Sequence, residues 1–116
     1  MDGEVTGDAG DTLVLRHQRD ADGISWRGVT LHPDGVLEVS GQDLGQAVED
    51  HWGSREYEFS RRLAPAEVDR LRVLLGLGPR DDLLAAIGST FAESDALEEF
   101  LVHHDLAGSF WSRTGD

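Results

Sequence analysis

Histidines and acidic residues are the groups that could do acid–base or metal chemistry in this chain, because its 116 residues include no cysteine. His103 and His104 are adjacent, and neighbouring side chains on a helix diverge by about 100°, so they cannot jointly bind one metal ion. His17, His32 and His51 lie in separate stretches and could meet only through folding. The sequence therefore predicts no metal site and no cofactor.

Glu56 and Glu58 are the carboxylate pair with the best spacing for catalysis. At alternate positions of a strand they project from one face, an arrangement that a glycoside hydrolase can use, although a solvated sheet face has the same pattern. The chain has no phosphate-binding loop and no GxGxxG, HExxH or GxSxG motif. We expect no catalytic residue and no enzyme; a small hydrolase that uses His51 with Glu56 or Glu58 is the third hypothesis.

The net charge of −13 is the strongest global feature of the composition, and all ten basic residues are arginine. Residues 1–50 have a net charge of −8, residues 51–80 of +2, and residues 81–116 of −7. Such a field repels nucleic acid and anionic membranes and steers basic proteins toward the chain. Solubility and the Arg-rich coding of a GC-rich genome also explain this composition. The predicted partner is a protein with a basic surface, neither nucleic acid nor membrane.

The length suits one domain with a single core, so we expect residues 1–11 to be a disordered acidic tail and residues 12–116 to form a single α+β domain. The first residues show no signal peptide, and no apolar run approaches the roughly 20 residues of a membrane span. We therefore expect a cytoplasmic protein.

The first half of the domain predicts strands over residues 12–17, 24–32, 36–40 and 56–63. Alternation in the first strand places Leu13 and His17 on one face. The sequence His32–Pro33–Asp34–Gly35 predicts a tight turn between the second and third strands. Asp43 could cap a short helix over residues 44–51.

The second half predicts three helices, over residues 66–75, 81–92 and 95–104. Pro65 suits the first helical position and Ser94 suits a cap. Val68, Leu71, Leu74 and Leu75 are the predicted buried face of the first helix. We expect Trp26 and Phe110 in the core, and Phe110 and Trp111 folded back onto the sheet or helices. The fold class is α+β, with a small antiparallel sheet of about four strands covered on one face by about three helices.

The stretch between the third and fourth strands is the best candidate for partner binding. Trp52 lies between His51 and Gly53 and beside acidic residues, which suits an aromatic interface anchor, although a core or capping role would also explain it. The residues predicted to bind a partner are Asp43, Glu49, Asp50, Trp52, Glu56 and Glu58.

The segments HPDGVLEVSGQDLG, EDHWG, EYEF, LAPAEVDRL, LLGLG and FWSRTGD resemble a group of small acidic actinobacterial proteins of uncharacterised role. In size, acidity and α+β pattern the chain is similar to the immunity proteins that neutralise secreted polymorphic toxins. The resemblance implies a non-enzymatic inhibitor whose acidic residues block a cationic, nuclease-like toxin. The alternative is a regulatory or scaffold subunit that acts as a homodimer.

Overall fold

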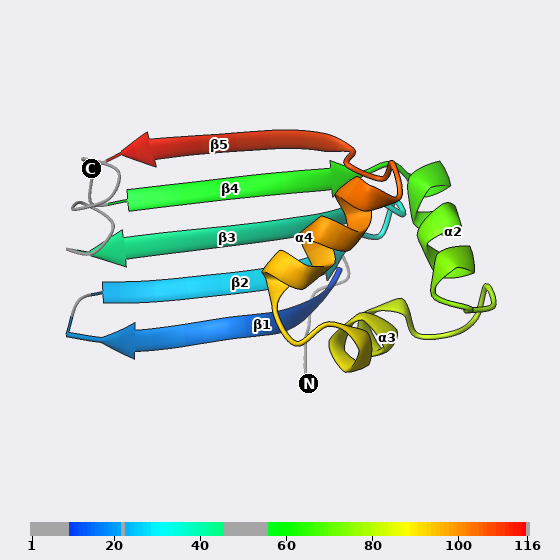
Figure 1. Cartoon of the computed structure of the whole chain (residues 1–116), viewed down its shortest axis with the longest axis horizontal. Helices are drawn as coiled ribbons and strands as arrows, with labels where there is room; N and C mark the ends of the chain where they lie inside the picture. The colour runs from blue at the N-terminus through cyan, green and yellow to red at the C-terminus, as the bar shows by residue number, and fades with distance from the viewer. Residues whose placement is uncertain (1–9, 22, 46–55, 116) are drawn as a thin grey trace.

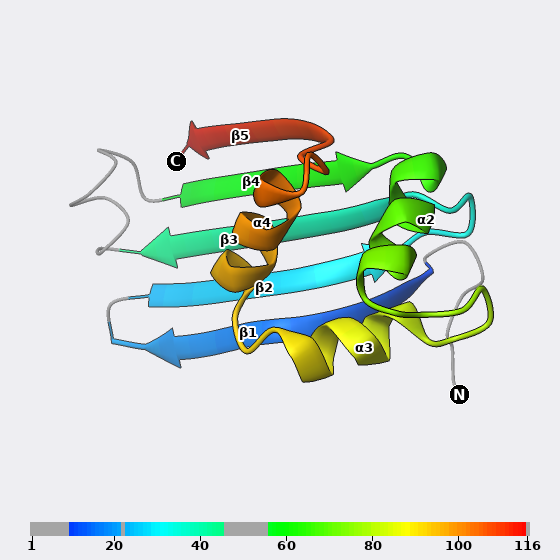
Figure 2. The same ribbon diagram turned by 45° about the vertical axis from the view of Figure 1, so that its right-hand side comes forward.

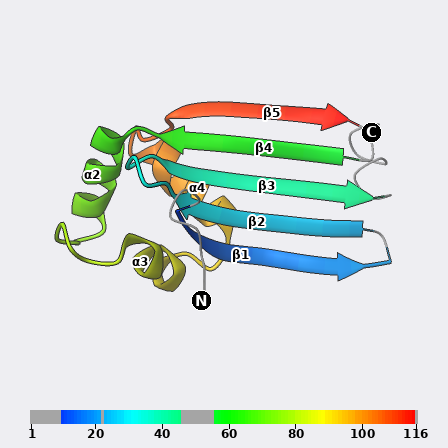
Figure 3. The ribbon, with the colours of Figure 1, turned by 180° about the vertical axis from the view of Figure 1, so that it is seen from behind.

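The computed structural model describes residues 10–21, 23–45 and 56–115. These residues form a single antiparallel sheet in the order β1-β2-β3-β4-β5, together with helices α2, α3 and α4 (Figure 1). The elements are β1 (Asp11–Asp20), β2 (Gly23–Leu31), β3 (Leu37–Gly45), β4 (Glu56–Leu63), α2 (Pro65–Leu74), α3 (Leu83–Thr90), α4 (Ser94–His103) and β5 (Ser109–Gly115). All three helices lie on one side of the sheet, as a second view shows (Figure 2). Seen from behind, the opposite face is open (Figure 3).

The α+β prediction is confirmed, but the sheet has five strands, so the expected number of about four is wrong. The additional strand is β5, which pairs with β4 from Arg62↔Ser109 to Glu56↔Gly115. Phe110 and Trp111 do fold back onto the sheet, as a strand at its edge. They remain 51% and 52% exposed, so Phe110 is not a core residue.

The predicted turn between β2 and β3 is present, with the Gly35 N–H donating to the His32 carbonyl at 3.0 Å. Strand β3 then continues to Gly45, beyond the expected end at residue 40, and includes Asp43 and Leu44. The predicted helix therefore does not begin at Leu44; residues 46–51 lie outside the described residues. Asp43 pairs with a neighbouring strand instead of capping a helix.

The core lies between the helices and the covered part of the sheet. Its fully buried side chains come from both layers: Val29, Leu37, Val39, Leu63, Leu71, Ile87, Leu97, Leu101 and Leu106. Leu74 was expected among them but is 42% exposed. At about 100° per residue, Val68, Leu71 and Leu75 cluster on one side of α2, and Leu74 lies about 60° beyond them.

The helices begin through local hydrogen bonds that the sequence partly predicts. Helix α2 begins at Pro65, as expected, and the Ala64 N–H donates to the Glu67 carboxylate at 2.9 Å. Asp82 caps α3 by accepting from the Ala85 N–H at 3.1 Å. Ser94 is not the cap of α4: it is the first helical residue and is buried, and Glu93 occupies the cap position. None of the described helices is long and apolar enough to cross a membrane.

Strand β1 contains a bulge between Val14 and Arg16, where its pairing with β2 shifts by one residue. One extra residue moves every later side chain of the strand to the opposite face of the sheet. Leu13 and Arg16 therefore both lie on the helix side, and His17 lies on the open face. The prediction that Leu13 and His17 share a face is wrong for this reason.

Candidate functional site on the open sheet face

The open sheet face is a broad surface that none of the described helices covers (Figure 3). Core residues Val29 and Val39 point to the helix side, so the alternate positions of each strand point to the open face. Read across the paired strands, these positions include Trp26, Gly28, Glu38, Gln42, Glu56, Glu58, Ser60, Arg62, Trp111 and Arg113. The open face thus combines two tryptophans with acidic and basic residues.

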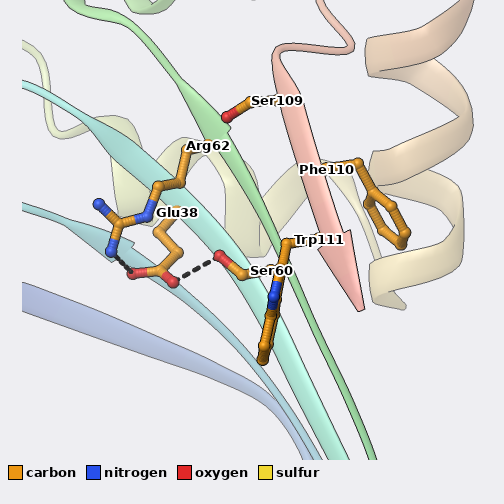
Figure 4. Close-up of a pocket in the computed structure, with 6 residues that line it drawn as sticks. All are labelled: Glu38, Ser60, Arg62, Ser109, Phe110 and Trp111. Atoms are coloured by element: carbon orange, nitrogen blue, oxygen red, sulfur yellow. Dashed lines mark hydrogen bonds and ion pairs between the residues drawn. The ribbon is translucent and has the colours of Figure 1, made fainter. Parts of the chain in front are cut away.

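Glu38 of β3 is the centre of a polar network on this face. Its carboxylate accepts a hydrogen bond from Ser60 Oγ at 2.6 Å, and His32 Nε2 lies 2.9 Å from Oε1. Arg62 Nη2 lies 3.4 Å from the same Oε1. Figure 4 shows Ser60 and Arg62 converging on Glu38. Strand pairing produces this arrangement, because Glu38 is opposite Arg62 and Ser60 is the next position on the same side of β4.

The network keeps Glu38 ionised. Burial is the largest influence and by itself would raise the pKa, but the Ser60 and His32 hydrogen bonds and the Arg62 charge outweigh it and lower the pKa. A carboxylate of lowered pKa is a weak base. Ser60 and His32 both bind Glu38, so the histidine does not stand between a carboxylate and a hydroxyl as nucleophilic catalysis requires. The network is therefore better suited to holding the strands and accepting hydrogen bonds.

A shallow pocket of about 380 Å³ lies beside this network at the β5 margin. It is lined by Glu38, Ser60, Arg62, Ser109, Phe110 and Trp111. Trp111 lies on the side of β5 where Glu38 and Ser60 are found, whereas Phe110 points to the other side, toward the helices (Figure 4). The pocket thus joins an ionised carboxylate to an exposed indole.

Trp26 also belongs to the open face. Its ring covers Gly28, because a Cβ at Gly28 would lie 2.3 Å from the ring. Strand alternation places Trp26 opposite the helix-side core that contains Val29, so the expectation of a core position is wrong. Gly28 provides the flat surface on which the indole lies.

The predicted partner-binding residues are divided between the two faces. Asp43 lies on the helix side, where Arg27 donates to both carboxylate oxygens at 2.8 and 2.9 Å and Ser25 donates at 2.7 Å. Burial alone would raise the pKa of Asp43, but the hydrogen bonds from Arg27 and Ser25 and the Arg27 charge lower it. This carboxylate is already held by a bidentate ion pair.

Glu56 and Glu58 share the open face, so the structure brings these two predicted residues together. Gln42 Nε2 donates to Glu56 at 2.9 Å, and Arg113 of β5 forms an ion pair with Glu58. The other predicted partner-binding residues, Glu49, Asp50 and Trp52, lie outside the described residues, as does His51.

Sequence reasoning missed the residues that surround Glu38. Ser60 and Arg62 follow Glu58 at period two, so alternation was a usable signal for their shared face. Their approach to Glu38 depends on the β3–β4 register, and the contribution of Trp111 depends on a strand that was not predicted.

A second surface depression lies between α4 and β5 on the helix side. It has a volume of about 530 Å³ and is lined by Arg61, Glu98, Glu99, Val102, His103 and Phe110. Arg61 forms an ion pair with Glu98 at 2.8 Å, and its guanidinium carbon lies 4.9 Å from the Phe110 ring centroid. Both depressions therefore border β5.

Within the part of the chain that the structure describes, no group of three or more His, Cys, Asp or Glu residues is placed to hold a metal ion. No protein-family model, curated protein or solved structure matches the chain.

Proposed function

We propose that the protein is a non-enzymatic, cytoplasmic protein-binding module, most concretely an immunity-type inhibitor that blocks a cationic, nuclease-like toxin. The observation that supports this proposal is the pair of carboxylates, Glu56 and Glu58, that the strand register places on the open sheet face of a chain of net charge −13. A partner with a basic cleft would be attracted over a long range and would find a broad, accessible surface.

The chemistry of the site favours binding over catalysis. Glu38 has a lowered pKa and is therefore a weak general base. Both neighbouring depressions are open and shallow, whereas catalytic pockets enclose most of their substrate. An open polar face with exposed indole area is instead typical of protein recognition.

The ion pair between Glu58 and Arg113 leaves this surface available to a partner. The two side chains are 25% and 58% exposed, and ion pairs with such access to water contribute about 0–1 kcal/mol. An incoming Lys or Arg can therefore replace Arg113 at small cost. Glu49 and Asp50 would add long-range attraction, and Trp52 is the proposed apolar anchor, whereas Asp43 is already neutralised by Arg27 on the helix side.

The test is binding to the basic C-terminal domain of a secreted protein encoded by the neighbouring gene, with association rates measured by biolayer interferometry. Raising salt from about 0.01 to about 0.1 M shortens the Debye length from about 30 to about 10 Å, so association should slow about tenfold or more. The double variant Glu56→Gln/Glu58→Gln should also slow association.

Asp69→Asn provides the matched control, because Asp69 is an exposed acid on α2, away from the open face. Because it removes one charge, it is compared with Glu56→Gln and with Glu58→Gln made singly, and it should slow association less than either. Association that does not depend on salt, or equal effects at Asp69 and at Glu56 and Glu58, would contradict the electrostatic mechanism.

A further inference from the structure

Strand β5 forms a regular edge of the described sheet. Its seven residues pair with β4 without any shift in register, and no other described strand lies on its outer side. Phe110 and Trp111 project from it to opposite faces and are both about half exposed. Such an edge can add another strand through its backbone N–H and C=O groups.

Three arginines beside β5 are neutralised by ion pairs within the chain. Arg113 pairs with Glu58, Arg62 with Glu38, and Arg61 with Glu98. These pairs make the β5 margin less acidic than the chain as a whole, which has a net charge of −13. Because these pairs reduce the local charge, a second copy of an equally acidic chain could approach this margin with little local repulsion.

We propose that β5 pairs with the β5 strand of a second copy of this chain, antiparallel across a twofold axis. The two five-stranded sheets would then become one continuous sheet. An antiparallel pair of identical strands is self-complementary, as a twofold interface requires. The dimer is closed, because the remaining edges are the two β1 strands, each with a bulge and with Arg16 and Arg19 along it.

Exposed aromatic residues provide apolar area on both faces of the junction. On the open face, Trp111 of each chain lies next to the added strand, beside the pocket at the β5 margin. On the helix side, Phe110 and Val102, the latter 54% exposed, line the depression between α4 and β5. Side chains of the added strand would cover part of each depression and remove this apolar surface from water.

Salt distinguishes this proposal from the proposed function. Two chains of like net charge repel each other, so screening should tighten the dimer. Binding of a basic partner should weaken with salt. The dimer does not depend on the existence of a toxin, and either proposal can fail alone.

The experiment is sedimentation equilibrium of the full chain at low and high salt, with Trp111→Glu and Val14→Glu as a matched pair. Both residues are 52% exposed and lie on the open face, at opposite edges of the sheet. We expect a species of twice 12.7 kDa that is favoured by salt. Trp111→Glu should raise the dissociation constant of the dimer about 30-fold, as the loss of an aromatic interface anchor does. Val14→Glu should leave the dissociation constant unchanged.

Hydrogen exchange of the unmodified protein keeps the proposal testable if Trp111→Glu fails to fold. Amides of β5 should become more protected as protein concentration rises, while those of β1 should not. A 12.7 kDa species at all concentrations up to about 1 mM, equal effects of the two variants, or concentration-dependent protection at β1 would overturn the proposal. Protection of β5 only when a different protein is added would assign the edge to that partner instead.

Discussion

Strands β1 and β5 both form an edge of the sheet, yet β1 is bulged and charged whereas β5 is regular and aromatic. In β1 the register shifts at Val14/Arg16, and Arg16 reaches Glu93 before α4 at 3.0 Å. In β5 the register is unbroken, and its one arginine, Arg113, turns back onto Glu58 of β4. The bulge and the charges of β1 are features that prevent edge-to-edge pairing, and β5 has neither a bulge nor a charge of its own left unpaired.

The helices strengthen this contrast. Helix α3 packs along the β1 side, where Leu13 approaches Gly88 closely enough that a Cβ there would lie 3.4 Å from the leucine side chain. Next to β5, Phe110 and Val102 remain about half exposed beside α4. The β1 edge is therefore covered by elements of its own chain, whereas the β5 edge retains exposed apolar surface that a further chain can bury.

The largest expected effect comes from blocking the start of β5. Gly108 has a φ of 61°, and a Cβ there would lie 2.1 Å from the Arg62 carbonyl oxygen. Gly108→Val should lower the free energy of unfolding by about 2–5 kcal/mol, because a left-handed backbone and a backbone clash add together. Urea unfolding followed by Trp fluorescence measures this loss.

Gly10→Val is the matched change at β1, since a Cβ there would lie 2.3 Å from the Leu31 carbonyl oxygen. Gly10→Val should lower the free energy of unfolding by less than Gly108→Val does, because Leu13 and Leu15 of β1 also pack against the core. An equal or larger loss at Gly10 would show that the helices do not anchor β1 more firmly than β5.

An intermediate effect is expected from the two carboxylates of β3, which link that strand to opposite halves of the sheet. Asp43 binds Arg27 of β2, on the β1 side, and Glu38 binds Ser60 and Arg62 of β4, on the β5 side. Asp43→Asn should lower the free energy of unfolding by about 2–3 kcal/mol. This is less than the usual loss when a buried ion pair is broken, because the Asp43 and Arg27 side chains are both partly exposed. Glu38→Gln should cost about 1–2 kcal/mol, since Arg62 is largely exposed.

The pH dependence of stability separates these contributions from packing. Both pKa values are lowered in the folded chain, so the stabilisation is present above the unfolded values of about 3.9 for Asp and 4.3 for Glu. It is lost as pH falls below them, through the folded values. In urea unfolding, the free energy of unfolding should fall less between neutral and acidic pH in Asp43→Asn and in Glu38→Gln than in the unmodified chain. An equal fall in the variants and the unmodified chain would contradict the assigned ion pairs.

The smallest effect is expected from the exposed ion pairs at the two edges. Arg16→Ala and Arg113→Ala should each change the free energy of unfolding by less than about 1 kcal/mol, because water screens both pairs. Thermal melts at low and high salt provide the measurement, with salt reducing each difference. A larger loss at Arg113 alone would mean that β5 is held chiefly by charge.

Much of the fold follows from hydrophobic alternation and from turn and cap residues. The prediction of residues 56–63 as a strand is confirmed at both ends, because Tyr57 and Phe59 alternate with polar residues. The start of α2 at Pro65 is confirmed as well, since proline suits the first helical position.

The missed features have physical causes in the two edges and in strand pairing. The sequence of β5 has Phe110 and Trp111 adjacent, because an edge strand exposed on both faces need not alternate apolar and polar residues. The bulge in β1 has no recognisable sequence signal, but it moves the His17 side chain to the open face. The separation of Asp43 from Glu56 and Glu58 required the extension of β3 to Gly45 and its register with β4.

The position of β5 in the chain also determines the order in which the sheet can be completed. Strands β1 to β4 pair with their sequence neighbours, but β5 follows α2, α3 and α4 before it reaches β4. During synthesis, at about 5–20 residues per second, the first four strands are made seconds before β5, so any sheet that forms in this interval has β4 as an edge. The strand proposed to join two chains is thus also the last of the five described strands to be synthesised.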